Sequence, residues 1–285
     1  KMILNTWTRT DIPAFFSEWF YNRVKQWYVL VRNPYFPEKI SKYIITPEVV
    51  ECIAFCTKNP APMFPRLDEI RDFWQFWFVS INPYWKEVEP FVPPTDKVIN
   101  SFIELSNKIW KQKVSWRYDP IFINETYTIQ KHIEFFEYIA SKLANYTLEC
   151  VISFIDLYEK TKKNFPWVKA VSQADRLTIW KEFKKICDKY NIELKTCVEW
   201  TDLAQFGIDC SWCMTKPIIE RAIWYELELK VKKSKRWVCD CLIWNDIWAY
   251  NTCLHGCLYC YANADFNKVK ENFKNHNPNS AFLIN

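Results

Sequence analysis

Short runs of alternating or continuous apolar residues recur along the chain, and most are separated by stretches with helical spacing. The strand-like runs, rich in β-branched and aromatic residues, are residues 2–6, 28–32, 51–57, 77–84, 114–123, 150–157 and 192–198, and a hairpin-like stretch through residues 40–45 follows the second run. Helical spacing is found in residues 13–26, the stretch before Phe73, and residues 95–109, 129–143 and 174–190. Strands that alternate with helices form parallel sheets, and about seven such units close a barrel. The pattern predicts an α/β fold, a (βα) barrel of six to eight parallel strands.

The alternation stops after Glu199. Beyond it, the chain contains short helices near residues 217–225 and 266–273, separated by a basic run at residues 230–236. That run is expected to be a solvated loop. We therefore expect two parts, a barrel in residues 1–200 and a cysteine-rich, cluster-binding segment in residues 201–285 that packs on the barrel mouth.

Charge and apolar content exclude some classes of function. The net charge is +5 with lysine and arginine scattered, so nothing demands a nucleic acid partner. No apolar run reaches the length that spans a membrane. We therefore expect no membrane partner. Twelve cysteines without a signal peptide indicate a reducing, cytoplasmic compartment.

Glycine and tryptophan are present in abnormal numbers. The chain has 2 glycines and 16 tryptophans, whereas average usage would give roughly twenty glycines in this length. Positive-φ turns and helix ends need glycine, and tryptophan stands where such positions are expected. Our hypothesis is that most tryptophans are glycines decoded from UGA, while Trp19, Trp77 and Trp116 are genuine. The alternative is a tryptophan-rich binding surface.

Three cysteines on one short loop are the strongest chemical signal. Cys253, Cys257 and Cys260 form a C-x3-C-x2-C triplet with Tyr259 before the last cysteine. Three thiolates can hold three irons of a [4Fe-4S] cluster and leave the fourth iron open to a small molecule. A structural zinc ion, or thiols that bind nothing, are the alternatives. His255 is expected to support the ligands and not to be one.

A second metal is predicted nearby. Cys197, Cys210, Cys213, Cys239 and Cys241 lie within forty-five residues, and four of them, with Cys210, Cys213, Cys239 and Cys241 preferred, could hold a second iron-sulfur cluster or a zinc ion. An iron-sulfur cluster is favoured over zinc because the neighbouring loop, with its C-x3-C-x2-C triplet, has the pattern of a loop that binds a redox-active cluster. Cys197 could instead face a substrate.

Polar residues end nearly every predicted strand. They are Arg9, Asp11, Arg32, Asn33, Lys58, Asn59, Asn82, Tyr84, Arg117, Asp119, Asp156 and Glu199. In a parallel barrel these ends meet on one face, so a polar pocket is expected there, with Arg117, Asp119, Asp156, Arg9 and Asp11 as candidate catalytic residues. The alternative is that polar residues simply begin where strands end.

Six stretches together resemble a known family. They are Arg9-Thr-Asp-Ile-Pro-Ala-Phe, Thr57-Lys-Asn-Pro-Ala-Pro, Trp116-Arg-Tyr-Asp-Pro-Ile, Val151-Ile-Ser-Phe-Ile-Asp-Leu-Tyr, Cys239-Asp-Cys and Thr252-Cys-Leu-His-Gly-Cys-Leu-Tyr-Cys-Tyr-Ala. These resemble the bacterial family of domain of unknown function 1848, over essentially the whole chain. The family is described as having a carboxyl-terminal cysteine cluster similar to that of radical S-adenosylmethionine (SAM) domains. The stretch from Trp116 also resembles a strand of spore photoproduct lyase relatives.

The resemblance implies a radical SAM-like barrel that is circularly permuted, because the cysteine loop ordinarily follows the first strand. It implies that Cys253, Cys257 and Cys260 ligate a [4Fe-4S] cluster and that the backbone at Tyr259 lies near the adenine of SAM. A flavodoxin or ferredoxin would then donate electrons, and the enzyme would make a 5′-deoxyadenosyl radical that acts on a substrate of unknown size. The alternative is a non-catalytic iron-sulfur or zinc protein that senses redox state or binds a partner, since the Gly-Gly-Glu motif of many radical SAM enzymes is missing.

Overall fold

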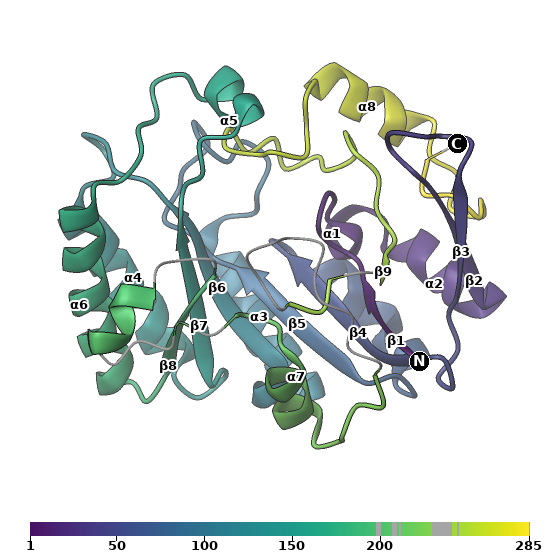
Figure 1. Ribbon diagram of the computed structural model, residues 1–285, viewed down its shortest axis with the longest axis horizontal. Coiled ribbons are helices and arrows are strands. Elements are labelled where there is room, and N and C mark those ends of the chain that lie inside the picture. The colour runs from purple at the N-terminus through teal and green to yellow at the C-terminus, as the bar shows by residue number, and fades with distance from the viewer. Residues whose placement is uncertain (198–200, 207–209, 211, 230–240, 244, 285) are drawn as a thin grey trace.

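A seven-stranded parallel sheet forms the centre of the protein (Figure 1). The computed structural model describes residues 1–197, 201–206, 210, 212–229, 241–243 and 245–284. The sheet has the order β8-β7-β6-β5-β4-β1-β9, and every pairing within it is parallel. Its strands are β1 (Met2–Asn5), β4 (Val50–Thr57), β5 (Gln75–Ser80), β6 (Val114–Ile121), β7 (Glu149–Phe154), β8 (Glu193–Thr196) and β9 (Asn245–Asp246).

This sheet confirms the predicted α/β class with parallel strands. The strand order rises steadily from β1 to β8, which is the order of a singly wound sheet and not of a doubly wound one. Within the described residues, β8 and β9 each pair with one neighbour, so they are the two edges.

One predicted barrel strand lies elsewhere. Residues 28–32 form β2 (Tyr28–Arg32), which pairs antiparallel with β3 (Ile40–Ile44) in a separate two-stranded sheet. The prediction that this run belongs to the central sheet was wrong. The β-branched pattern that identifies a strand carries no information about its partner.

Helices fill most connections between the strands. They are α1 (Ile12–Phe15), α2 (Ser17–Gln26), α3 (Thr95–Ile109), α4 (Ile129–Leu143), α5 (Glu159–Asn164), α6 (Gln173–Lys189), α7 (Lys216–Ile223) and α8 (Phe266–Lys274), with 3-10 turns η1 (Ala61–Ile70), η2 (Lys111–Lys113) and η3 (Thr201–Phe206). The predicted bounds of α3 and α4 are confirmed. The single helix predicted over residues 13–26 is instead two helices that meet at Phe16. No helix in the described part of the chain is long and apolar enough to cross a membrane.

The two faces of the sheet have different covers. Alternate strand residues such as Phe55, Trp77 and Trp116 pack into the larger core with helices α2, α3, α4 and α6. The intervening residues, such as Phe76 and Phe78, pack against α7 and its flanking segments in a second cluster. Period-two alternation explains this division, because neighbouring side chains in a strand point to opposite faces. We call the face under α7 the inner face.

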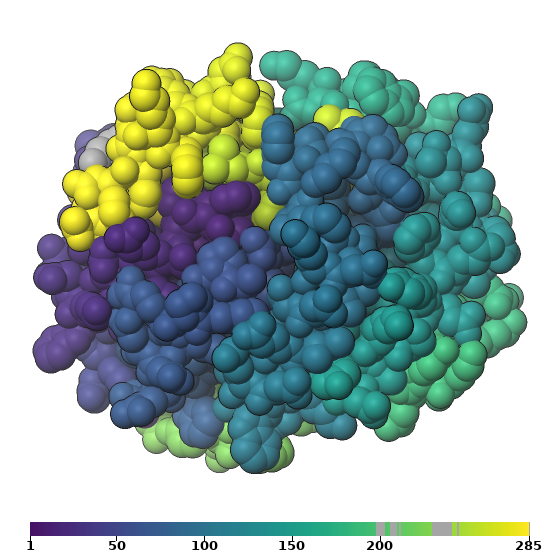
Figure 2. Space-filling model, turned by 180° about the vertical axis from the view of Figure 1, so that it is seen from behind, coloured from purple at the N-terminus to yellow at the C-terminus, as the bar shows by residue number. Residues whose placement is uncertain are grey.

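The first and last segments of the described chain pack against each other. Strand β9 pairs with β1, and Trp19 donates its indole N–H to the carbonyl of Ser280 at 2.9 Å. Leu30 and Phe282 form an isolated bridge. Figure 2 shows the C-terminal residues, in yellow, lying against the N-terminal ones, in purple. Residues far apart in sequence therefore share one edge of the sheet.

Three tryptophans adopt backbone conformations that normally need glycine. Trp27 and Trp224 follow α2 and α7 with φ of 63° and 53°, and Trp110 follows α3 with φ of 82° and ψ of 136°. The last pair of angles lies outside the small left-handed region that L-residues visit. These three indoles are 66, 72 and 61% exposed, respectively. In contrast, Trp19, Trp77 and Trp116 are fully buried, and each indole N–H donates a hydrogen bond.

Candidate functional site at the carboxyl edge of the sheet

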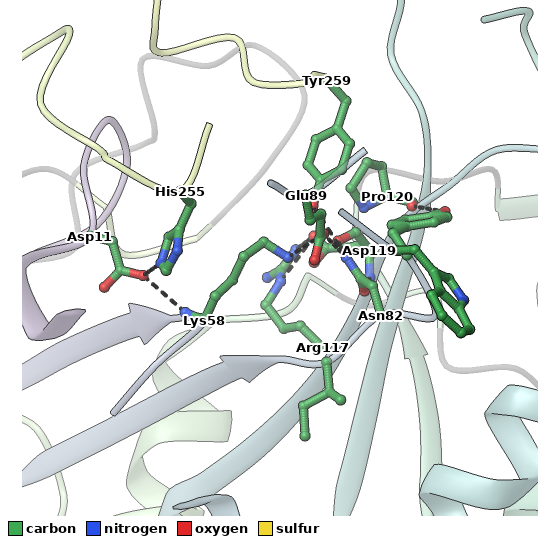
Figure 3. A network of polar contacts seen from close by, with 12 residues as sticks. Asp11, Lys58, Asn82, Glu89, Arg117, Asp119, Pro120, His255 and Tyr259 are labelled. Carbon is green, nitrogen blue, oxygen red and sulfur yellow. Dashed lines mark hydrogen bonds and ion pairs between the residues drawn. The ribbon is translucent and has the colours of Figure 1, made fainter. Parts of the chain in front are cut away.

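The cysteine loop lies over the carboxyl ends of the strands, and Asp11 anchors one side of it. Asp11 follows β1 and caps α1, since its Oδ1 accepts the backbone N–H of Ala14 at 3.0 Å. Its Oδ2 accepts the backbone N–H of Lys58 at 2.9 Å and lies 2.8 Å from Nε2 of His255 (Figure 3). Both Asp11 and His255 are buried. One carboxylate thus connects β1, the end of β4 and the loop.

Glu89 anchors the other side of the loop. Its buried carboxylate accepts a hydrogen bond from the Tyr259 hydroxyl and forms an ion pair with Lys58, whose Nζ lies 3.0 Å away. Asn82, at the end of β5, donates to the same carboxylate at 3.2 Å. Figure 3 shows Tyr259 pointing down from the loop onto Glu89 and Asn82.

Lys58 keeps its charge although it is nearly buried. Burial alone would lower the pKa of this ammonium, but the negative charges of Glu89 and Cys257 together raise the pKa above its usual value. Lys58 therefore places a positive charge beside Glu89, close enough to Cys257 for the two groups to influence each other.

Backbone contacts also fix the loop. The N–H of Phe91 donates to the carbonyl of His255 at 3.1 Å, and the N–H of Leu258 donates to that of Val88 at 3.0 Å. Gly256 has φ of +70°, and a Cβ there would lie 2.9 Å from Cδ2 of Phe91. Only glycine fits this turn without movement, which explains why one of the chain's two glycines lies between Cys253 and Cys257.

The three loop thiols are half-buried and influence one another. Burial raises the pKa of the Cys253 thiol well above its usual value, and the negative charges of Asp11, Cys260 and Cys257 add to this effect. Burial likewise raises the pKa of Cys257 and of Cys260. The backbone N–H groups of Ala262 and Asn263 donate to Cys260 and act in the opposite direction.

Arg117 and Asp119 form an ion pair at the carboxyl end of β6. The Arg117 guanidinium lies 2.7 Å from Oδ2 of Asp119, and the Arg117 side chain is buried. Asn82 holds the Asp119 backbone, because its amide donates to the carbonyl at 2.7 Å and its Oδ1 accepts the N–H at 3.1 Å. The structure therefore brings Asp11, Arg117 and Asp119, three of the five candidate catalytic residues, to the edge that holds the cysteine loop (Figure 3).

The structure places the other two candidates differently. Asp156 is exposed, and its Oδ2 accepts the Tyr158 hydroxyl at 3.2 Å. Arg9 lies with its guanidinium carbon 4.0 Å from the centre of the Trp248 ring and 5.1 Å from that of Tyr250. The contact of Asp156 with Tyr158 and those of Arg9 with Trp248 and Tyr250 do not reach the Asp11 or Glu89 anchors.

Sequence reasoning missed Glu89 entirely. It lies in the connection between β5 and α3, where no periodicity marks a position as buried. The available signal was Lys58, a strand-end cation in a buried stretch, which needs a carboxylate within reach.

A second group of thiols lies on the inner face. The Sγ of Cys213 is 3.6 Å from that of Cys197 and 3.8 Å from that of Cys241. Cys210 packs against the larger core, and Cys239 lies outside the described residues. Over the part of the chain that the structure describes, the His, Cys, Asp and Glu side chains as they stand form no group of three or more that could hold a metal ion. None of the eleven described cysteines is in a disulfide.

A singly wound parallel sheet whose carboxyl edge carries a cysteine loop fixed by buried charges defines an α/β protein with a candidate ligand site at that edge. The chain belongs to the family described as a domain of unknown function, DUF1848, whose model matches residues 3–262. The match covers both the sheet and the cysteine loop. Comparison with curated proteins gave no match, and comparison with solved structures gave none.

Proposed function

We propose that this protein is an iron-sulfur enzyme of the radical SAM type. The observation that supports this most strongly is the placement of Cys253, Cys257 and Cys260 on a loop fixed over the carboxyl edge of a parallel sheet. Both anchors of the loop, at Asp11 and at Glu89, come from the ends of sheet strands or the connections after them. In sheets of this kind, ligands bind outside the carboxyl ends of the strands.

The strand order supports a circular permutation. Strand β9 precedes the cysteine loop and lies next to β1, at the edge of the sheet. Counted across the sheet from the β9 edge, the strands are β9, β1, β4, β5, β6, β7 and β8. The cysteine loop follows β9 in the chain. This order has a cysteine loop directly after its first strand, as the resemblance to radical SAM domains implies. The proposal includes a barrel-like curvature of the sheet around the inner face.

The residues present fit an iron-sulfur cluster in three respects. Three thiols lie on one loop, the backbone N–H groups of Ala262 and Asn263 donate to one of them, and the surroundings exclude much of the solvent. Hydrogen bonds to sulfur and low solvent exposure are what tune such clusters. When bound, a [4Fe-4S] cluster with an open iron supplies one electron for the reductive cleavage of SAM.

The protein's own residues would fix geometry and balance charge. Asp11 and His255 would hold the loop at β1, and Tyr259 would hold it at Glu89. Lys58 provides a cation next to Cys257, which offsets the negative charge of thiolates. Arg117 and Asp119 would orient polar groups of a substrate from the end of β6.

Anaerobic reconstitution with iron and sulfide tests the proposal. The expected result is close to four irons and four sulfides per loop site, and release of 5′-deoxyadenosine from SAM after reduction with dithionite. C257A should abolish both the cluster and SAM cleavage. The matched control is C187A, which removes a buried thiol from α6, far from the loop in the sheet order, and should leave both unchanged. Replacing dithionite by reduced flavodoxin or ferredoxin tests the expected electron donor.

The same assay separates the second candidate. A protein that binds the cluster and never cleaves SAM would be a non-catalytic iron-sulfur protein, and one that binds no iron but loses zinc in C257A would have a structural zinc loop. Either result would contradict the enzyme proposal.

A further inference from the structure

A cluster of three thiols on the inner face of the sheet is not used by the loop site. Cys197 directly follows β8, Cys213 precedes α7, and Cys241 lies in the segment that packs next to α7. Cys213 is the central member, with its Sγ 3.6 Å from Cys197 and 3.8 Å from Cys241. We propose that these three cysteines bind a single tetrahedral metal ion, with zinc preferred.

The sulfur separations favour one ion over a cluster. Zinc binds thiolate sulfur at about 2.3 Å, so two sulfurs on one tetrahedral ion are about 3.8 Å apart. Both measured separations are close to this value. A [4Fe-4S] cluster binds each cysteine through a different iron, which holds the sulfurs further apart. This geometry favours zinc at the second site, whereas the sequence favoured iron-sulfur there.

The side chains as they stand do not enclose an ion. Because both contacts share Cys213, the sulfurs of Cys197 and Cys241 lie no more than 7.4 Å apart, the two distances added. Drawing them round a common centre is therefore a local adjustment of side chains. Three thiolates leave one tetrahedral position for a fourth ligand.

The surroundings suit a buried, negatively charged site. Arg117 donates from Nη1 to the sulfur of Cys213 at 3.5 Å, so a guanidinium already faces the thiols. Three thiolates around Zn²⁺ carry one net negative charge, and buried charge requires such a partner. Cys213 and Cys241 are buried among apolar residues that include Met214 and Leu242, which shield the site from water. Each thiol releases its proton when the metal binds.

The test uses the full chain with C253S/C257S/C260S, which removes the loop site and leaves the inner-face thiols intact. The expected result is one zinc per chain by elemental analysis, with little iron or acid-labile sulfide. Substitution by Co²⁺ should give the visible absorption of a tetrahedral ion and strong thiolate charge-transfer bands. Adding C213S to that background should remove the metal, while adding C187S, a control in the larger core, should retain it.

Three results would overturn the proposal. The loop variant could contain no metal, it could contain iron and sulfide in cluster amounts, or C213S could keep the zinc. If C213S fails to fold, the cobalt spectrum of the loop variant still decides, because a spectrum without thiolate bands contradicts the site. The loop proposal is judged separately, by SAM cleavage in the wild type.

An independent observation concerns the tryptophans. Among the residues that the structure describes, five non-glycine residues have positive φ, and three of them are Trp27, Trp110 and Trp224, all at helix ends and all highly exposed. Glycine is the residue that terminates helices in this conformation. We infer that these positions are glycine in the native protein and that their codons are UGA, whereas Trp19, Trp77 and Trp116 have UGG codons.

Three tryptic peptides test this inference with an internal control. Residues 26–32 contain Trp27 and residues 222–230 contain Trp224, whereas residues 10–23 contain Trp19, which is buried. In protein purified from the cells that make it, mass spectrometry should find glycine at 27 and 224 and tryptophan at 19. Finding tryptophan at all three would overturn the inference.

Discussion

The Nε2 of His255 lies 2.8 Å from Oδ2 of Asp11, although 244 positions separate the two residues in the chain. Each partner is buried, and the same carboxylate also caps α1 and accepts the backbone N–H of Lys58. This one contact joins the first strand to the cysteine loop, so it is the natural place to test how firmly the loop is held.

D11N should weaken this junction. An amide at position 11 keeps one oxygen for the α1 cap but loses the charge that faces His255 and Lys58. Because these donors are buried, the free energy of unfolding should fall by about 2 kcal/mol. Urea denaturation measures it. The control D156N changes an exposed carboxylate at the end of β7 and should stay within about 0.5 kcal/mol of wild type. Equal effects of the two variants would contradict a special role for Asp11.

E89Q should lower the free energy of unfolding strongly, although the glutamine side chain has nearly the same size as glutamate. The substitution leaves the Lys58 ammonium without a countercharge in a site where its side chain is 13% exposed. Removing one partner of a buried ion pair costs about 3 kcal/mol.

The double variant K58M/E89Q separates charge from shape. It should recover much of the lost free energy of unfolding, because no unpaired cation remains. E125Q, which changes an exposed carboxylate, should be neutral. If the double variant is less stable than E89Q, the ion pair is not the cause.

Acid should destabilise the protein through His132. Burial lowers the pKa of this histidine in α4 to about 4, against 6.5 for the ordinary side chain, while its hydrogen bond with the Phe122 carbonyl acts the other way. The unfolded chain therefore takes up a proton at a higher pH than the folded one. The stabilisation that neutral His132 contributes to the free energy of unfolding is fully present above pH 6.5 and is lost as the pH falls toward 4. At pH 5 the loss is about 2 kcal/mol.

Comparing urea midpoints at pH 7.5 and pH 5 measures this loss. H132F should show a smaller drop between the two pH values, even though it loses the hydrogen bond from Tyr118 at both. A drop of the same size in H132F would assign the acid sensitivity to other groups.

Glycine at the helix ends should stabilise the recombinant chain. W110G removes a side chain from a backbone conformation that L-residues avoid, and the free energy of unfolding should rise by about 1 kcal/mol. W77G, in contrast, empties a buried position that stacks on Phe55 with ring centres 4.0 Å apart, and should cost at least about 3 kcal/mol. Thermal denaturation of both variants gives the comparison. A destabilising W110G would contradict the assignment.

Local signals predicted much of the fold. The bounds of α3 and α4 followed from strong helical spacing, and α4 also has a Thr128 cap that accepts the N–H of Lys131. Strand β9 was missed because two residues carry no periodicity. The hairpin-like stretch after residues 28–32 agrees with the β2-β3 pairing, but the exclusion of β2 from the central sheet was missed because strand pairing is a tertiary property.

The candidate site was predictable only in part. The cysteine spacing identified the loop, and strand-end positions identified Asp11, Arg117 and Asp119. Glu89 could not be found this way, since its burial depends on how the connection after β5 folds back over the edge. The sequence also could not show that Cys197 approaches Cys213 while Cys210, the other member of the C-x2-C pair, packs against the larger core.

The position of the cysteine loop, on residues from the N-terminal third of the chain, has a consequence for biosynthesis. Asp11, Lys58 and Glu89 leave the ribosome long before Cys253, so the edge that receives the loop is built from chain that is already available to fold. Cys253, Cys257 and Cys260 are translated late, when the strand-end residues that hold their loop have already been synthesised. Contacts across more than two hundred residues close slowly, and until they close, the polar residues that hold the loop are exposed to solvent while Cys253, Cys257 and Cys260 are not yet in place.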